Sequence, residues 1–212
     1  MGVKLARKKP RILWASLFYR VHKLLPLSSK AKFKLYLNMA WWFERLSHEM
    51  SFRYYNAQNH PLRIHPRKFL QRHLNKDFTV LDLGCHSGDI TVMAAEVSKK
   101  VVGIDYNAGA IEQAKATYKR DNLTFIAGEA FEFLSKNEEK FDVLILSHIL
   151  EHLDNPQSFL DTFKGFFRYI YIELPDFDKS YHNHYRKDLN LQLVYTDDDH
   201  VSEFDRDELA AI

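Results

Sequence analysis

The feature that most constrains this chain is the segment Val80–Asp89, which reads VLDLGCHSGD. An apolar run typical of a buried strand leads directly into Gly84 and Gly88, and helical spacing follows them. Glycine allows a tight backbone turn and lets a ligand come close to the main chain. The helix after the turn offers free amide groups and the positive end of its dipole. The segment therefore predicts a strand, a turn and a helix that together bind a ligand.

An acidic residue, Asp105, strengthens this interpretation. It ends a second apolar run, seventeen residues after Gly88, and a carboxylate there can accept hydrogen bonds from both hydroxyls of a ribose. The glycine turn lacks the spacing of the GxGxxG dinucleotide motif, and it has no lysine of the kind an ATP-binding P-loop requires. NAD and ATP are therefore disfavoured as ligands.

From Phe78 onward, five apolar runs alternate with stretches of helical spacing. Strands that are apolar almost throughout, joined by crossover helices, form a parallel sheet covered on both faces. We therefore expect an α/β fold with a Rossmann-like, doubly wound, mostly parallel sheet that binds ligands at the carboxyl ends of its strands. The expected strands are 78–83, 99–104, 123–127, 141–146 and 169–174, and the expected helices are 88–97, 107–119, 129–136 and 156–167.

The chain is predicted to divide into a helical cap, residues 1–60, and a domain proper, residues 61–212. Prolines at 61 and 66 are expected to mark the end of the cap, because the residue before a proline avoids the helical conformation. The predicted cap helices are 12–25 and 29–50, separated by Pro26 and an N-cap at Ser28-Ser29.

Basic residues are concentrated in the cap. Residues 1–43 hold ten Lys or Arg and no acidic residue, although the net charge of the chain is only +2, and seven acids lie within 197–208. A basic segment favours an anionic partner. Two interpretations stay open: a cap that packs on the domain, or a basic amphipathic helix within 1–27 that lies on an anionic membrane surface. No run is apolar enough to span a membrane.

Together, these motifs resemble those of the class I S-adenosylmethionine (SAM) dependent methyltransferases, over roughly residues 66–212. VLDLGCHSGD resembles the first motif, beside the methionine part of SAM, and VVGIDYN resembles the second, with Asp105 on the ribose and Tyr106 flanking the adenine. FIAGEAFEFL resembles the third, at the adenine edge, and FDVLILSHILEHLDNP the fourth, near the sulfonium. The cofactor-binding residues that the resemblance implies are Asp82, Gly84, Cys85, His86, Gly88, Asp105, Tyr106, Glu129, Ala130, Ser147 and His148.

The chain departs from the family pattern in two places. His86 stands where the family has the middle glycine of the turn. We expect it to be tolerated if its side chain points outward, and to narrow the methionine site otherwise. The family also adds a sixth and a seventh strand after a helix like the one predicted at 206–212, and we expect these terminal strands to be missing here.

Candidate residues for acting on the acceptor follow the fourth strand. His148, Glu151 and His152 have the spacing that places three side chains on one face of a helical turn, and His200 follows later. The set resembles the Glu-x-x-Glu-His plus His pattern of the ubiquinone-pathway O-methyltransferases and of the small-RNA 3′-terminal 2′-O-methyltransferases, with His148 in place of the first Glu. This resemblance implies a divalent metal held by these four residues, and the imidazoles favour zinc or manganese over magnesium. The alternatives are His152 as a lone base and a purely structural role. The candidate catalytic residues are His152 and Glu151.

The predicted function is SAM-dependent O-methylation of a hydroxyl on a small molecule or a saccharide. RNA ribose methylation is an alternative, made weaker by the confinement of basic charge to the cap, and so is a non-catalytic SAM-binding subunit. Segment 181–185 is either a polar surface loop or a reader of the acceptor. The single Cys85 fits a reducing compartment, so we expect a cytoplasmic location, with attachment to the inner face of the membrane as the alternative. The sequence predicts no oligomeric state.

Overall fold

A five-stranded parallel sheet forms the centre of the protein. The computed structural model describes residues 13–56, 59–136 and 139–212. The strand order is β3-β2-β1-β4-β5, and all four pairings are parallel, which confirms the predicted doubly wound sheet. No sixth strand occurs within the described ranges. The strands are β1 (Thr79–Leu83), β2 (Lys100–Asp105), β3 (Leu123–Ala127), β4 (Val143–Ser147) and β5 (Tyr169–Glu173).

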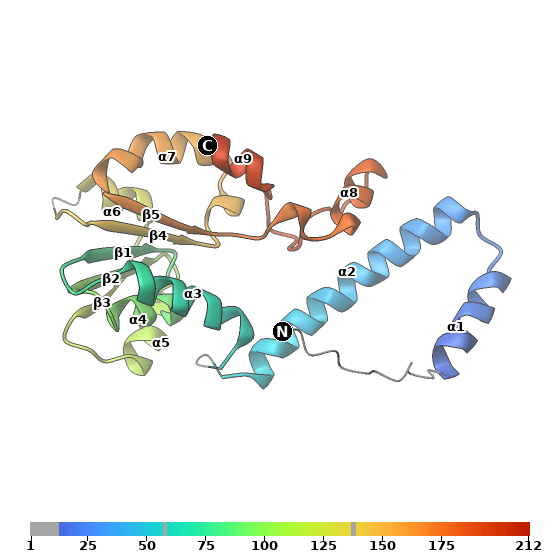
Figure 1. Ribbon diagram of the computed structural model, residues 1–212, viewed down its shortest axis with the longest axis horizontal. Helices are drawn as coiled ribbons and strands as arrows, with labels where there is room; N and C mark the ends of the chain where they lie inside the picture. The colour runs from blue at the N-terminus through green and yellow to red at the C-terminus, as the bar shows by residue number, and fades with distance from the viewer. Residues whose placement is uncertain (1–12, 57–58, 137–138) are drawn as a thin grey trace, which may run out of the picture.

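Helices cover both faces of the sheet, because successive strand side chains point to opposite sides. Val80 and its neighbours pack with Leu70 of α3 (Pro61–His73) and Met93 of α4 (Asp89–Ala95), whereas Leu81 packs with Phe159 of α7 (Pro156–Phe163). Figure 1 shows α3, α4 and α5 on one side of the sheet and α6, α7 and α9 on the other. These helices are α3 (Pro61–His73), α4 (Asp89–Ala95), α5 (Ala108–Thr117), α6 (Ala130–Lys136), α7 (Pro156–Phe163) and α9 (Arg206–Ala211); short 3-10 turns are η1 (Leu150–His152), η2 (Lys164–Phe166) and η3 (Phe177–Lys179).

Two helices lie where the sequence predicted none. Pro61 begins α3, whose N-cap, His60, has the extended backbone expected before a proline, and the helix continues through Pro66. The expectation that Pro66 marks a boundary was wrong, because a proline in the second turn removes only one backbone hydrogen bond. Segment 181–185 is not a loop either: it belongs to α8 (Tyr181–Asp188), which begins at an N-cap formed by Ser180.

An arm of two helices extends from the carboxyl edge of the sheet. It consists of α1 (Leu13–Leu24) and α2 (Ser29–Tyr54), which begins at the predicted N-cap, Ser28. Along one side, α2 packs against α8, while α1 contacts α2 at the far end through His22 and Tyr36. No helix in the described part of the chain is both long and apolar enough to cross a bilayer.

Candidate functional site

The glycine turn after β1 is held to the end of β2 by the main chain. The backbone N–H groups of Gly84 and Cys85 both donate to the carbonyl oxygen of Ile104, at 2.8 and 3.1 Å. Gly84, His86 and Gly88 have φ values of 69°, 44° and 83°, in the left-handed region. A Cβ on Gly88 would lie 2.6 Å from the ring of Phe125. The turn therefore requires glycine at position 88 for both its dihedral angle and its space.

Asp105 connects this turn to the end of β2. One carboxylate oxygen accepts from the backbone N–H of His86 and the other from that of Asn107, each at 2.8 Å. Each oxygen retains a lone pair for a further donor. Tyr106 and Glu129 lie beside it with exposed side chains, and Ala130 begins α6. The predicted cofactor residues of the second and third strands thus meet at one edge, where a ligand can reach them.

Asp82 and Cys85 lie at the carboxyl end of β1, inside the protein. Both side chains are buried, and Asp82 accepts a hydrogen bond from the Thr91 hydroxyl at 2.7 Å. Burial raises the pKa of the Asp82 carboxyl to about 7, against the opposing effect of that hydrogen bond. Burial likewise raises the pKa of the Cys85 thiol, which disfavours the reactive thiolate form. The side chain of His86 is exposed. This is the outward orientation in which we expected a histidine to be tolerated at this position.

At the end of β4 the backbone takes a second unusual turn. His148 has φ 57°, in the left-handed region, and its N–H donates to the carbonyl oxygen of Glu173 at 2.8 Å. The Glu173 carboxylate accepts from Ser147 Oγ at 3.0 Å and from the Tyr171 hydroxyl at 3.1 Å. Burial, with Glu173 adding to it, raises the pKa of Tyr171. Strained backbone of this kind is concentrated at functional sites.

The helical turn expected to place His148, Glu151 and His152 on one face does not form. His148 lies outside any helix, and only Leu150–His152 make a single 3-10 turn. His148 Nδ1 nevertheless lies 3.0 Å from Glu151 Oε1. The Glu151 side chain is fully buried, and its second oxygen, Oε2, has no hydrogen-bond partner. A buried carboxylate oxygen without a partner can still accept a hydrogen bond or bind a cation.

Glu151, His152 and His200 come together across a long stretch of sequence. Each offers one ligand atom, and these atoms all lie within 4.8 Å of one another. The rings of His152 and His200 meet edge to face, with centroids 4.9 Å apart. His148 is outside this group of three, although it touches Glu151. Asp199 lies nearby, 3.8 Å from His152 Nδ1.

Glu203 fixes the ring of His200. Its Oε1 accepts from His200 Nδ1 at 2.7 Å and also from the backbone N–H and hydroxyl of Thr196. A carboxylate on one ring nitrogen sets the tautomer and directs the other nitrogen, Nε2, away from it. Nε2 of His200 is therefore the ring nitrogen left free for a further partner.

Three residues of this site were not predicted. Glu203 was counted only as part of an acidic segment, although its spacing from His200 matches a side-chain pair. Glu173 is the next-to-last residue of the predicted strand 169–174 and the last residue of β5, at the end of the strand where such sheets bind ligands. His48 comes from α2, and its pKa is lowered by burial and by the charges of Arg45, His60 and His148. Only the third needs knowledge of how α2 folds back to the sheet.

Most residues of this site lie within a region shared with a known protein family. A family model described as a methyltransferase domain matches residues 74–200, which include the glycine turn, Asp105 and the group around Glu151. The chain belongs to the methyltransferase-domain family. Solved structures agree on the fold: a SAM-dependent methyltransferase from Archaeoglobus fulgidus is 20% identical with a TM-score of 0.54, and the match covers 79% of this chain and 71% of that one.

Curated relatives differ in the molecules named in their descriptions. A ribosomal protein L11 methyltransferase of Dictyoglomus thermophilum is 32% identical over 103 residues, which cover 46% of this chain and 32% of the relative. A ubiquinone biosynthesis O-methyltransferase of Pelagibacter ubique is 29% identical over 112 residues, covering 47% and 45%. The regions that match this methyltransferase-domain chain therefore cover less than half the length of each of these two relatives.

Proposed function

We propose that this chain transfers the methyl group of SAM to a hydroxyl oxygen of a small-molecule or saccharide acceptor. The observation that carries the proposal is the buried Glu151 carboxylate, which has one unpartnered oxygen and forms a group with His152 and His200. Carboxylate and imidazole groups beside a ligand edge suit the removal of a proton from a hydroxyl. The named activity of the Pelagibacter ubique relative, an O-methyltransferase, supports the same reaction class.

On the cofactor side, the residues of the chain hold and orient SAM. SAM supplies an activated methyl group when it is bound. Asp105 has acceptor capacity left for ribose hydroxyls, and Tyr106 offers an exposed ring beside it. Asp82, two residues before Gly84 at the carboxyl end of β1, would in its ionised form supply a negative charge suited to the cationic methionine end. These groups select a SAM-like ligand by position and charge, without taking part in bond changes.

On the acceptor side, Glu151, His152 and His200 place two imidazoles and one carboxylate at the point where the hydroxyl must lose its proton. Because Glu203 occupies Nδ1 of His200, the free Nε2 of that ring can bind. This donor set fits a divalent transition ion, zinc or manganese rather than magnesium, since imidazole suits these ions. Such an ion would lower the pKa of a bound hydroxyl. His152 takes the proton in the absence of an ion.

The test is release of S-adenosylhomocysteine by the purified chain with separate pools of hydroxylated small molecules, saccharides and RNA. We expect turnover with one of the first two pools. His152→Ala and His200→Ala should each lower turnover by about 100-fold or more, and leave SAM affinity, measured by calorimetry, unchanged. His65→Ala is the matched control, because His65 lies on the outside of α3 and is exposed; it should behave as the parent.

Chelation separates the two forms of the proposal. Excess EDTA should lower turnover to the level of His200→Ala without altering SAM affinity, and readdition of zinc or manganese should restore it. Full turnover in EDTA, with no metal by elemental analysis, would remove the ion and leave His152 as the base. Turnover with RNA alone would overturn the acceptor class. SAM binding without turnover on any pool would favour a non-catalytic subunit.

A further inference from the structure

The long helix α2 carries two apolar faces. Its first face packs against α8 and the segment that follows it: the Leu37 carbonyl accepts from Arg186, and Trp41 Nε1 donates to the Tyr195 carbonyl at 2.6 Å. The second face lies on the opposite side of the helix, where residues recur at three- or four-residue spacing. Its members are all exposed by 37–62%: Leu35, Met39, Trp42, Phe43, Leu46 and Met50.

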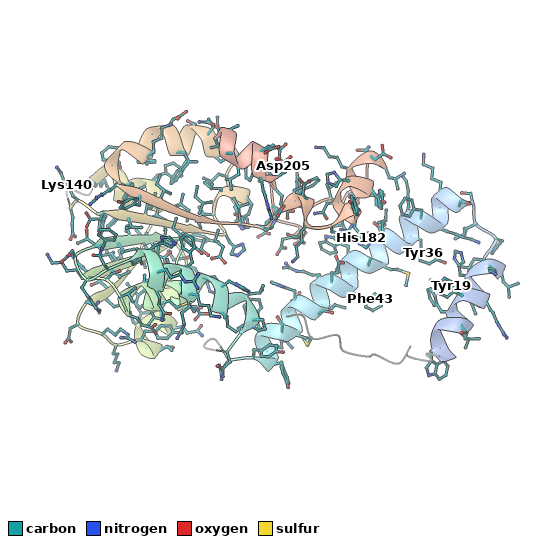
Figure 2. All side chains as sticks on the ribbon, in the orientation of Figure 1. Tyr19, Tyr36, Phe43, Lys140, His182 and Asp205 are labelled. Carbon is teal, nitrogen blue, oxygen red and sulfur yellow. The ribbon has the colours of Figure 1, made fainter. Side chains whose placement is uncertain are left out.

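Figure 2 shows this arrangement directly. Phe43 projects from the side of α2 that faces away from α8, whereas His182 lies between α8 and α2. Six large apolar side chains along a single helix face exceed the scattered apolar residues of an ordinary surface. The second face of α2 therefore lacks a partner within the described part of the chain.

The helix α1 repeats the pattern at the tip of the arm. Its apolar residues share one face, while Arg20, His22 and Lys23 lie on the other. Phe18 and His22 touch Tyr36 of α2, but most of the apolar face is open. The exposed members of this face are Trp14, Leu17, Phe18, Val21 and Leu24, of which Trp14 is 78% and Leu24 is 82% exposed.

Charge identifies the surface that would cover these faces. In the described part of α1 and α2, the first acidic residue is Glu44, whereas Arg20, Lys23 and Lys32 lie beside the apolar side chains. Tryptophan and tyrosine at the border between apolar and cationic groups are typical of the membrane interface. Basic amphipathic helices with an aromatic apolar face bind anionic bilayers in this way.

We propose that the α1–α2 arm docks on an anionic lipid bilayer, with the second face of α2 and the apolar face of α1 inserted among the headgroups. The helix α2, about 39 Å long at the usual rise per residue, runs from the arm tip to the acceptor side of the domain, where Arg45 forms an ion pair with Asp197, close in sequence to His200. The arm thereby holds the acceptor side of the sheet near the lipid surface. This docking does not depend on methyl transfer.

A second copy of the chain is less well suited to cover the arm. Three of the seven acids in segment 197–208 are already engaged within the chain itself. Asp197 pairs with Arg45, Asp205 caps α9, and Glu203 is buried against His200. A bilayer of anionic lipid requires no such acids from the protein.

The test is co-sedimentation of the full chain with vesicles, in the absence of SAM and acceptor. We expect binding to vesicles of phosphatidylcholine mixed with phosphatidylglycerol, weak binding to phosphatidylcholine alone, and loss of binding in high salt. Phe43→Glu combined with Leu46→Glu should weaken binding by at least about tenfold, because two apolar side chains lose their insertion. Arg20→Gln with Lys23→Gln should weaken it by about thirtyfold, as each cation near the surface contributes about fivefold.

Phe166→Glu is the matched control, because Phe166 is 69% exposed on η2, away from the arm; it should bind as the parent does. Both face variants replace exposed residues, so SAM affinity and the circular dichroism spectrum should stay unchanged, which shows that they fold. Equal sedimentation of the parent and of Phe43→Glu/Leu46→Glu would overturn the proposal. So would a dimer in sedimentation velocity that this double variant converts to monomer, since the face would then join two copies.

Discussion

The carboxyl ends of β1 and β2 and those of β4 and β5 lie on one edge of the sheet, but they hold their polar groups by different means. At β1 and β2, backbone N–H groups of one short turn form the hydrogen bonds. Those of Gly84 and Cys85 donate to the Ile104 carbonyl, and that of His86 donates to the Asp105 carboxylate. At β4 and β5, side chains bind side chains from distant segments, as Glu173 binds Ser147. We refer to these as the cofactor half and the acceptor half.

This difference implies that the two halves can be altered separately. The cofactor half depends on a few left-handed dihedral angles and on one carboxylate, so most side chains around it can change without moving the turn. The acceptor half depends on partners such as Glu151 and Glu203, whose loss leaves buried polar atoms without a bond. Gly84 is where the halves meet, because a Cβ there would overlap the side chain of Ile149.

In the acceptor half, a large effect is expected from Glu203→Ala. This change removes the acceptor for His200 Nδ1 and for the Thr196 N–H, so the His200 ring loses its orientation. Loss of such an orienting carboxylate lowers activity by about 10–100-fold. Steady-state kinetics should show this fall in kcat, while calorimetry shows SAM affinity unchanged. Asp207→Ala, an exposed acid of the same segment, should alter neither quantity. A parallel loss of SAM affinity in Glu203→Ala would contradict the separation of the halves.

The mirror-image experiment in the cofactor half is Asp105→Ala. It removes both the ligand for the His86 and Asn107 amides and the acceptor for ribose hydroxyls. SAM binding should weaken by about 1.5–3 kcal/mol, the size of a lost hydrogen bond to a charged group. At saturating SAM, kcat should recover most of its value, because the acceptor half is intact. Unchanged affinity in calorimetry would show that Asp105 only holds the turn.

The cofactor half could be predicted from the sequence, whereas most of the acceptor half could not. The turn at Gly84 to Gly88 and the acid at Asp105 are local, so strand spacing and glycine chemistry predicted their places and the sheet around them. The acceptor half needs contacts between residues far apart in sequence, and local spacing wrongly predicted a helical turn through His148. Its φ of 57° instead directs the chain away from a helix. The pairing of Glu203 with His200, and the approach of His48 from α2, depend on tertiary packing.

A pH-dependent effect of intermediate size is expected from Asp82→Asn. Burial raises the pKa of Asp82 to about 7 in the folded protein, above its value of about 3.9 in an unfolded chain. The folded state therefore favours the protonated carboxyl, and stability is lost as pH rises from about 4 to about 7. Ionisation would cost roughly 4 kcal/mol above that range, but the Asn amide is itself buried, which leaves a net gain of about 1–2 kcal/mol.

Urea unfolding at pH 4 and pH 8 measures this effect. Asp82→Asn should be more stable than the parent at pH 8 and show no gain at pH 4, and its SAM affinity at pH 8 should fall with the lost charge. Asp121→Asn, at an exposed position, should show no pH-dependent difference. An equal stability difference at both pH values would mean that Asp82 is ionised throughout, and would remove its pKa from the account of the cofactor half.

The smallest expected effect concerns His86, the one residue of the glycine turn that is not small. Its φ of 44° lies in the left-handed region, which disfavours a residue with a Cβ by about 1 kcal/mol. His86→Gly removes that strain but adds backbone freedom to the unfolded chain, which offsets about half of the gain. His86→Ala keeps the Cβ and loses the same exposed ring, so it isolates the dihedral angle. Urea unfolding should rank Gly above Ala by about 0.5–1 kcal/mol, with SAM affinity unchanged in both because the His86 N–H to Asp105 bond belongs to the backbone. If Ala proved the more stable of the two, the turn would be relaxed at position 86, and the rigidity assigned to the cofactor half would have to come from Gly84 and Gly88 alone.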